Sequence, residues 1–372
     1  MVLAFAFSRR YNTHPVVNVS TQSRTGRAWI EVNLANLVAN AQTVRAAAKG
    51  AALLPMVKAD GYGLGAVEVA RALEDLDPWG FGVATPEEGV VLREAGIRRP
   101  VLVFTPASPE TQDLFLRHDL RAVLDDPAVI DRWHLPFHLE IDTGMGRCGI
   151  RYDDECLENI DSRMLEGVFT HFYAADDSPG TVTEQWARFE SAIDSLPRRP
   201  EVVHAANSAG AWRLDASVDI VRPGIFLYGG RCGEDLPAPA PVATLHARVV
   251  SVRSLPQGAT VSYGGDWTAT RDTIVATLGI GYADGVRRSL QGRAQVLLQN
   301  VRYPVVGRVT MDFIMVDIGP EGKAKVGDNA TLIGGTEETA ITLDEFASWS
   351  STISYEVLTG LGSRVVREYL PL

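Results

Sequence analysis

Short runs of apolar and β-branched residues alternate with helical stretches between residues 53 and 228 of the chain. Eight of these runs have the length and composition of buried strands. They cover residues 53–57, 79–84, 101–105, 120–124, 137–141, 167–172, 201–206 and 219–228. Such alternation is typical of parallel strands joined by helical crossovers, and eight units predict a (β/α)8 barrel of the TIM type. The active site of such a barrel lies at the carboxyl ends of its strands.

The segment TPEEGVVLREAG (85–96) has the sequence signals of a crossover helix. Thr85 can cap its start, Pro86 suits its first position, and Glu88 completes a capping box. Gly96 is a typical residue just beyond a helix end. We therefore expect a helix between the second and third predicted strands. Upstream of the barrel, residues 28–50 read as a strand followed by an amphipathic helix.

The pattern changes after residue 240 to strand-like segments rich in Val, Thr and Gly. This change predicts a second, mainly antiparallel β domain. A short helix is expected at LDEFASWS (343–350), where Thr342 can cap it. We divide the chain into an extension at 1–26, a candidate for disorder, the barrel at 27–240 and the β domain at 241–372. The first strand of the barrel segment is a candidate to join the β domain.

At roughly 150 residues per domain, a length of 372 residues suggests two domains or one large barrel with an appendage. The net charge of -11 makes nucleic acid and anionic membranes unfavourable partners. Cys148, Cys156 and Cys232 form no C-x-x-C pair, so neither a disulfide framework nor a zinc site is expected, and a reducing cytoplasm fits best. No apolar run approaches the roughly eighteen residues of a membrane span. The start MVLAFAF precedes its basic residues, the reverse of a secretory signal.

Lysine is rare, because only Lys49, Lys58, Lys323 and Lys325 occur among the 35 basic residues. Lys49 lies in the last turn of a predicted helix, and the last two lie in a polar turn. Lys58 directly follows a predicted strand, at the catalytic rim of the barrel. Desolvation there can lower the pKa of an amine and favour a Schiff base. The alternative is a lysine that extends along the rim to reach solvent.

A Schiff-base lysine in a barrel serves either an aldolase or a pyridoxal-phosphate enzyme. Barrels commonly bind phosphate with the loops after strands seven and eight, which here read HAANSAG and RPGIFLYG. Ser208 offers a hydroxyl there, and Gly224 and Ile225 offer backbone N–H groups. Tyr62 can reach the same place from the first strand. Glycine-rich turns usually serve geometry alone, but the shared position of these groups is more specific.

These residues lie in motifs that resemble those of the alanine racemase family, whose members are pyridoxal-phosphate enzymes with a barrel and a β domain. The resemblance extends in order from residue 27 to residue 372. Its motifs are VKADGYGLG (57–65), DTGMGRCG (142–149), THFYAAD (170–176), HAANSAG (204–210), RPGIFLYG (222–229), VSYGGDW (261–267), GYADG (281–285), GRVTMD (307–312) and ISYE (353–356).

The resemblance implies that Lys58 holds pyridoxal 5'-phosphate covalently and is one of two acid-base groups at the substrate α-carbon. Tyr263 is expected as the other, on the opposite face. Racemisation needs both, because a proton removed from one face must be replaced from the other. Arg222 is expected to hydrogen-bond the pyridine nitrogen and keep it unprotonated. His171 resembles the histidine that links this arginine to the tyrosine, whereas His138 and His204 read as core residues.

Other site residues follow from the same motifs. Arg147 is expected at the cofactor phenolate and the substrate carboxylate, and the partner subunit of a homodimer is expected to supply Met311 and Asp312 beside that carboxylate. The remaining expected cofactor contacts are Tyr62, Asn207, Ser208, Gly224, Ile225 and Tyr355. A narrow entrance that favours a small substrate such as alanine is expected from Asp176, Tyr282, Arg288, Arg308, Ile353 and Tyr355. No metal is expected.

Glu140 departs from the family pattern. At this position, two residues before Asp142, many members carry a lysine that becomes carbamylated and orients the arginine of DTGMGR. Glutamate supplies a carboxylate directly, so we expect no carbamate here.

The resemblance implies an isomerase that supplies D-alanine for cell-wall synthesis, and it leaves rivals to be tested. A related decarboxylase typically has a glutamate at the pyridine nitrogen, where this chain has Arg222. A racemase of broader specificity is only weakly distinguished by the entrance residues. A non-enzymatic pyridoxal-phosphate carrier would not need the β domain with its Tyr263.

Overall fold

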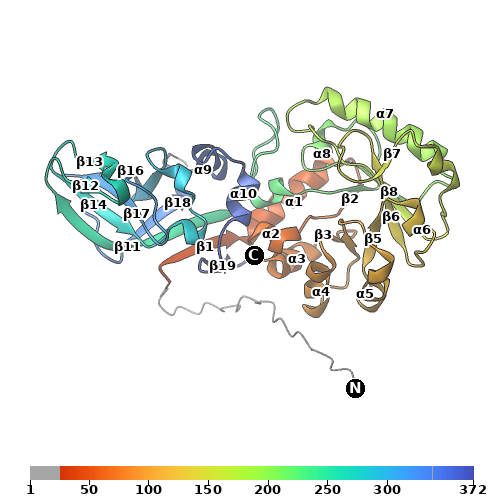
Figure 1. Ribbon diagram of the computed structural model, residues 1–372, viewed down its shortest axis with the longest axis horizontal. Helices are drawn as coiled ribbons and strands as arrows, with labels where there is room; N and C mark the ends of the chain where they lie inside the picture. Colours follow the sequence, from red (N-terminus) through yellow and green to blue (C-terminus); the bar gives the residue numbers. More distant parts are fainter. Residues whose placement is uncertain (1–25, 337) are drawn as a thin grey trace, which may run out of the picture.

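The structure is a computed structural model that describes residues 26–372 except residue 337. The expected extension at residues 1–26 therefore lies outside the described residues, apart from Gly26. The chain forms an α/β barrel and a β domain that lie side by side, with α1 (Leu34–Ala47), α2 (Lys58–Tyr62) and α10 (Ser354–Thr359) between them (Figure 1). None of the described helices is long and apolar enough to cross a membrane.

The predicted parallel barrel is confirmed. Its strands are β2 (Ala52–Leu53), β3 (Phe81–Val83), β4 (Val101–Val103), β5 (Arg121–Leu124), β6 (Phe137–Asp142), β8 (Leu165–Phe169), β9 (Val202–His204) and β10 (Ile220–Val221). They follow the order β2-β10-β9-β8-β6-β5-β4-β3, and every pairing is parallel. A parallel bridge between Met56 and Gly82 joins the two ends of this order. A Cβ atom on Gly82 would lie 2.5 Å from the Met56 sulfur, so a larger residue at this position would require the Met56 side chain to move.

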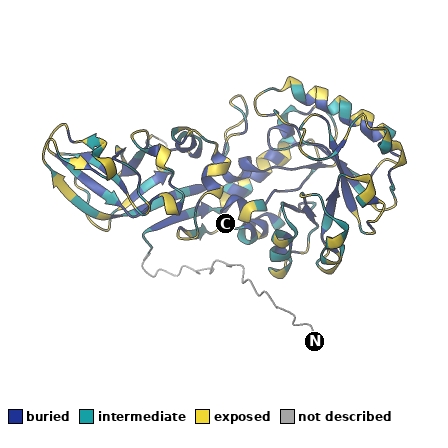
Figure 2. Ribbon diagram, in the orientation of Figure 1, coloured by how far each residue is buried: buried dark blue, intermediate teal, exposed yellow. Residues whose placement is uncertain are grey.

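Helices cover the outside of the barrel, so its strands are buried on both faces (Figures 1 and 2). They are α3 (Ala66–Glu74), α4 (Pro86–Glu94), α5 (Gln112–Arg117), α6 (Pro127–Ile130), α7 (Gly180–Ser195) and α8 (Gly210–Arg213). The expected helix at 85–96 is α4, and its Thr85 Oγ1 accepts from the Glu88 amide. The Glu88 carboxylate reaches back to the Ala84 amide at 2.7 Å, one residue earlier than in a standard capping box. A short strand β7 (Ile150–Arg151) beside β6 was not predicted.

The C-terminal region is antiparallel, as expected. Its sheet contains β11 (Ala243–Leu255), β14 (Thr273–Leu278), β15 (Gln295–Leu298), β16 (Val301–Val306), β17 (Ile314–Gly319) and β18 (Asn329–Ile333). The order β14-β17-β16-β15-β18-β11 closes on itself because β11 also pairs with β14. The short helix expected after Thr342 is α9 (Leu343–Trp349), capped by that threonine.

The first described strand, β1 (Ala28–Asn33), pairs with β11 and with the last strand, β19 (Val366–Leu370). From β1, in the sheet of the β domain, the chain enters the barrel through α1 and returns to the β domain after residue 240. Helix α10 packs against α2, and Arg367 Nε donates to the Gly63 carbonyl at 3.0 Å. These contacts fix the β domain against the barrel end that carries Lys58.

Candidate active site

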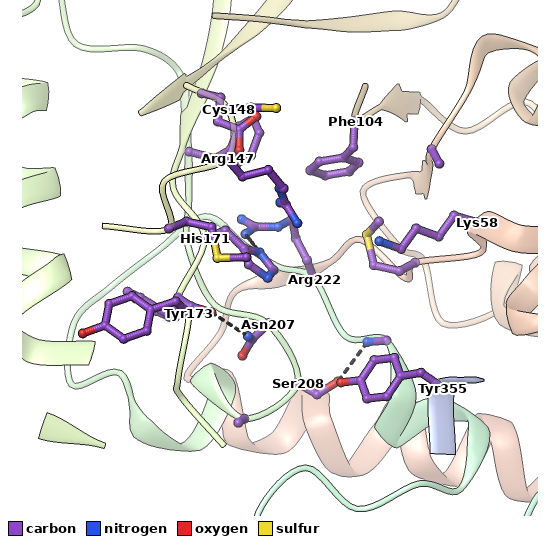
Figure 3. Close-up of a pocket in the computed structure, with 18 of the residues that line it drawn as sticks. Lys58, Phe104, Arg147, Cys148, His171, Tyr173, Asn207, Ser208, Arg222 and Tyr355 are labelled. Atoms are coloured by element: carbon purple, nitrogen blue, oxygen red, sulfur yellow. Dashed lines mark hydrogen bonds between the residues drawn. The ribbon is translucent and has the colours of Figure 1, made fainter. Parts of the chain in front are cut away.

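A cavity of about 740 Å³ opens at the carboxyl ends of the barrel strands. Its lining includes polar side chains that lie on or after five different strands: Lys58 after β2, Glu140 on β6, His171 after β8, Ser208 after β9 and Arg222 after β10. Figure 3 shows Lys58, His171, Ser208 and Arg222 around one space, with Arg222 between Lys58 and His171. The cavity therefore lies where the strand pattern predicts chemistry in a barrel.

Lys58 stands at the start of an unusual left-handed turn. The five residues that follow it, Ala59 to Gly63, all have φ angles between 52° and 82°. Left-handed backbone costs an L-residue roughly 1–2 kcal/mol, and only glycine adopts it freely. Strain of this kind persists only where the surrounding structure holds it, most often at functional sites.

Several contacts hold this turn in place. The Glu88 carboxylate accepts from the Ala59 amide at 2.8 Å, and Asp60 Oδ1 accepts from the Ala66 amide at 2.9 Å. Gly63 approaches α10 so closely that a Cβ atom there would lie 2.4 Å from the Leu358 carbonyl oxygen. The position of Lys58 is therefore fixed by three separate elements, α3, α4 and α10.

The electrostatics around Lys58 favour its neutral amine. Burial lowers the pKa of Lys58, and the positive charges of Arg147 and Arg222 lower it further. Glu88 opposes this effect only in part. A lysine with a lowered pKa is the kind that can act as a nucleophile or a base at neutral pH.

Arg222 is almost fully buried, with 3% of its surface exposed. Its Nη2 donates to the carbonyl oxygens of Thr170 at 2.8 Å and Ala205 at 3.1 Å. The guanidinium lies over the rings of Phe169 and Phe104, at 5.2 and 5.8 Å from their centroids. Burial lowers the pKa of Arg222 to about 9, so the group stays charged at neutral pH. It is a rigid cationic donor at the inner end of the cavity.

Two histidines contact this arginine, and a third contacts one of them. His171 Nδ1 lies 3.3 Å and His204 Nδ1 2.9 Å from the Arg222 nitrogens. Because a guanidinium only donates, both Nδ1 atoms accept, which leaves the ring protons on Nε2. Burial and the charge of Arg222 lower the pKa of His171 to about 3, so its ring is neutral. His204 Nε2 then donates to His138 Nδ1 at 2.8 Å. His138 and His204 are thus core residues, as expected, but they also support Arg222.

The other end of the cavity offers donors suited to a small anion. Ser208 Oγ accepts from the Gly224 amide at 2.9 Å, which leaves the serine proton for another acceptor. The Tyr62 hydroxyl lies where a side chain on Gly224 would be, 2.3 Å from the position of a Cβ atom. Tyr62 stacks on Tyr228, and the ring of Tyr355 lies 5.9 Å away. Ile225 begins the 3-10 turn that follows Gly224, and Asn207 lines the cavity beside Ser208.

Glu140 and Arg147 occupy the wall near Arg222. Glu140 is 5% exposed, and burial raises its pKa to about 7 although Arg147 and Arg222 oppose the shift. Arg147 lies in the loop after β6, where Asp142 Oδ1 accepts from the amides of Gly144 and Gly146 at 2.9 and 3.1 Å. The loop is therefore held by its own aspartate.

Other expected site residues lie apart, on the β domain. Tyr263, Met311 and Asp312 line a second hollow of about 370 Å³, and none of them lines the barrel cavity of the same chain. Tyr263 and Met311 are 70% and 52% exposed. Of the residues expected at the entrance, Asp176 and Ile353 line the barrel cavity with Tyr355, whereas Tyr282, Arg288 and Arg308 belong to the β domain.

Sequence reasoning missed Phe104, Phe169 and Glu88 as site residues. Their functional surroundings arise from packing between strands, since Phe104 follows β4 and Phe169 ends β8. A signal was available for Phe104, which lies near the carboxyl end of the predicted strand at 101–105, at the rim. Glu88 was predicted only as a helix-capping residue.

Comparisons with known proteins identify the family. The sequence model of the alanine racemase N-terminal domain matches residues 32–232, and that of the C-terminal domain matches residues 242–369. The chain belongs to the alanine racemase family. This family consists of pyridoxal-phosphate-dependent isomerases, so the expected family, enzyme class and cofactor are confirmed.

Individual alanine racemases match over nearly their full length. The alanine racemase of Carboxydothermus hydrogenoformans is 39% identical over 366 residues, 92% of this chain and 99% of that protein. The Enterococcus faecalis enzyme has a crystal structure that covers 93% of this chain and 98% of its own, with a TM-score of 0.86 and 31% identity. The Bartonella henselae alanine racemase, described with covalently bound pyridoxal phosphate, has a TM-score of 0.86 and 27% identity, and the alignment covers 93% of this chain and all of that one.

The barrel cavity fits the cofactor of the alanine racemase family. Lys58 supplies an amine of lowered pKa, Arg222 a buried donor, and Ser208 with Tyr62 hydroxyls for a phosphate. The missing side chain at Gly224 leaves room for the Tyr62 hydroxyl beside the backbone that Ser208 also contacts. These are the donor types, in one cavity, that a phosphorylated aldehyde with a ring nitrogen requires.

Proposed function

We propose that this protein interconverts L-alanine and D-alanine with pyridoxal phosphate as cofactor and thereby supplies D-alanine for cell-wall synthesis. One observation supports racemisation over decarboxylation above all others. The group buried at the inner end of the cavity is a cation, Arg222, and its hydrogen-bond acceptors are carbonyl oxygens and imidazole nitrogens. A guanidinium only donates hydrogen bonds, so a pyridine nitrogen beside it must accept and stays unprotonated. A glutamate at the same place would instead accept a hydrogen bond from a protonated pyridine nitrogen.

Pyridoxal phosphate, when bound, withdraws electrons from the α-carbon of an attached amino acid and makes its hydrogen acidic. Lys58 would hold the cofactor, and Tyr62, Asn207, Ser208, Gly224, Ile225 and Tyr355 would hold its phosphate end. Arg222 limits the electron withdrawal, which favours return of the proton to the α-carbon over its transfer to the cofactor. Arg147 would bind the phenolate and the substrate carboxylate.

Two groups move the proton in this proposal. The Lys58 amine removes or returns it on one face of the α-carbon, and a lowered pKa makes the neutral amine available for this step. The Tyr263 phenol acts on the opposite face. An ordinary phenol has a pKa near 10, so Tyr263 needs a nearby donor to act as a base. His171 can supply it, because Arg222 occupies its Nδ1 and leaves the proton on Nε2.

Tyr263 would come from a second subunit. Within one chain Tyr263, Met311 and Asp312 line the hollow on the β domain and Lys58 lines the barrel cavity, which supports a head-to-tail homodimer with two composite sites. Met311 and Asp312 would border the substrate carboxylate, and the entrance residues of both subunits would restrict entry to small substrates. We place the enzyme in the cytoplasm on the basis of its cysteines, none of which is paired.

Incubation with L-alanine in deuterium oxide, followed by chiral analysis, tests the reaction. Racemisation gives D-alanine that carries deuterium at the α-carbon. Release of carbon dioxide would instead identify a decarboxylase, and a panel of other amino acids separates a narrow racemase from a broad one.

Subunit mixing tests the composite site. Lys58→Ala and Tyr263→Phe homodimers should both be inactive, because each change damages both sites. Their heterodimer has one site with both changes and one with neither, so it should recover up to half of the activity. An inactive heterodimer would place both groups in one chain.

A further inference from the structure

Two loops of the β domain lie against each other beside the second hollow. One carries Tyr282 and the other carries Met311 and Asp312. The Tyr282 amide donates to the Thr310 carbonyl and the Ala283 amide to the Met311 carbonyl, both at 3.0 Å. A Cβ atom on Gly281 would lie 2.4 Å from the Thr310 carbonyl oxygen, so the two loops approach as closely as the backbone allows. They therefore form one structural unit.

Asp284 belongs to the same turn as Tyr282, and it is buried. Its carboxylate accepts from Arg27 Nη2 at 2.9 and 3.0 Å, from Arg364 Nε at 2.8 Å, and from the Gly281 amide at 2.9 Å. Burial of a carboxylate is costly unless it is paired and hydrogen-bonded, as Asp284 is here. The two arginines come from the chain just before β1 and just before β19, which are neighbouring strands.

Each arginine makes a second contact, and both contacts go to Asp312. Arg27 Nη1 donates to the Asp312 carbonyl at 2.8 Å, and Arg364 Nη1 donates to Asp312 Oδ1 at 2.9 Å. Each guanidinium thus bridges the buried Asp284 and the loop residue Asp312. We call Arg27, Asp284 and Arg364 the Asp284 clamp.

The clamp acts on a loop whose side chains project from the domain. Met311 is 52% exposed and Phe313 41% exposed, while the carboxyl of Asp312 is 39% exposed beside them. The loop is thus bonded to the clamp on its inner side, and its side chains are exposed on the other. The backbone of this loop is hydrogen-bonded to Tyr282 and Ala283, and the Asp312 side chain is held by its bond from Arg364.

We propose that Arg27, Asp284 and Arg364 are positioning residues that set where Met311 and Asp312 meet the substrate carboxylate in the partner's active site. This inference rests on the composite dimer of the proposed function. None of the three clamp residues need touch substrate. Loss of a bridge lets the loop move, which weakens substrate binding while Lys58 and Tyr263 keep their positions.

The two contacts of the Arg364 guanidinium offer the most direct test of this proposal. Its Nε and Nη1 reach two different carboxylates at once, which a single lysine ammonium cannot do in the same geometry. Arg364→Gln and Arg364→Lys should therefore both raise KM for alanine by about 10- to 100-fold, because displacement of a binding group by about 1 Å can have this effect. The kcat should stay within a few-fold. Arg302→Gln is the matched control, since it breaks a two-contact pair with Glu345 elsewhere in the same domain.

Heterodimers with a single working site decide whether the clamp acts on the partner. In the first, a chain with Lys58→Ala and Arg364→Gln is paired with an unmodified chain, so the working site takes its loop from the altered clamp. In the second, a Lys58→Ala chain is paired with an Arg364→Gln chain, so the working site takes its loop from an intact clamp. The proposal requires a raised KM in the first pairing alone, relative to Lys58→Ala paired with an unmodified chain.

The other outcomes overturn it in distinguishable ways. An ordinary KM in both active pairings would refute the clamp and leave the composite site standing. A raised KM in the second pairing alone would place loop and lysine in one chain and refute the composite site. Equal increases in both pairings, or the same increase in Arg302→Gln, would show a general structural effect and refute a positioning role. If Arg364→Gln does not fold, Arg27→Gln, which removes the other bridge, undergoes the same pairings.

Discussion

Replacement of Glu140 by glutamine should make the stability of the protein less sensitive to acid and base. Burial raises the pKa of Glu140 from an ordinary value of 4.5 to about 7, so the folded state holds this proton more tightly than the unfolded state. The stabilisation from proton binding is complete below pH 4.5 and is lost as the pH rises through 7. A shift of this size corresponds to about 3 kcal/mol. Glutamine does not titrate, so the free energy of unfolding of the variant should increase relative to that of the parent as the pH rises.

Urea unfolding of the cofactor-free protein at pH 5 and pH 8, at one protein concentration, measures this difference. We expect the stability of Glu140→Gln minus that of the parent to increase by about 2–3 kcal/mol between the two pH values. Glu94→Gln, at an exposed position of α4, gives the change that follows from removing one carboxylate from a protein of net charge -11. If Glu140→Gln changes with pH no more than this control, the carboxyl of Glu140 ionises normally and the argument from burial is wrong.

Further predictions concern the cavity. Lys58→Ala should remove the borohydride-reducible link to the cofactor, and a reducible link at another residue, located by peptide mapping, would contradict the assignment. Gly224→Ala should weaken cofactor binding at least tenfold by equilibrium dialysis, because its Cβ meets the Tyr62 hydroxyl, and Tyr62→Phe in the same chain should recover part of the loss. His204→Leu should lower the free energy of unfolding by roughly 1–3 kcal/mol, since it leaves an Arg222 donor unpaired. Rates with and without added bicarbonate should agree, because a glutamate at residue 140 has no amine that could be carbamylated.

Much of the fold follows from local patterns in the sequence. The eight barrel strands, α4 with its Thr85 cap and α9 with its Thr342 cap are confirmed at or near the predicted positions. Strand and helix signals are local, because they depend on the alternation of side chains and on contacts within a few residues. The placement of Lys58 at the rim follows from the same signal, since it directly succeeds a strand. The other expected site residues were assigned from motifs that resemble those of the alanine racemase family.

Tertiary structure alone decided how these parts meet. It paired β1 with β11 and β19, and it brought Arg222 into hydrogen-bond distance of His204 on β9 and of His171 after β8. It also separated Tyr263 from the barrel cavity of its own chain. The Asp284 clamp joins residues 27, 284, 312 and 364, whose local sequences give no sign of one another. Such contacts depend on the packing of elements that are distant in the chain, and a charge in the sequence does not reveal whether folding will bury it beside a partner.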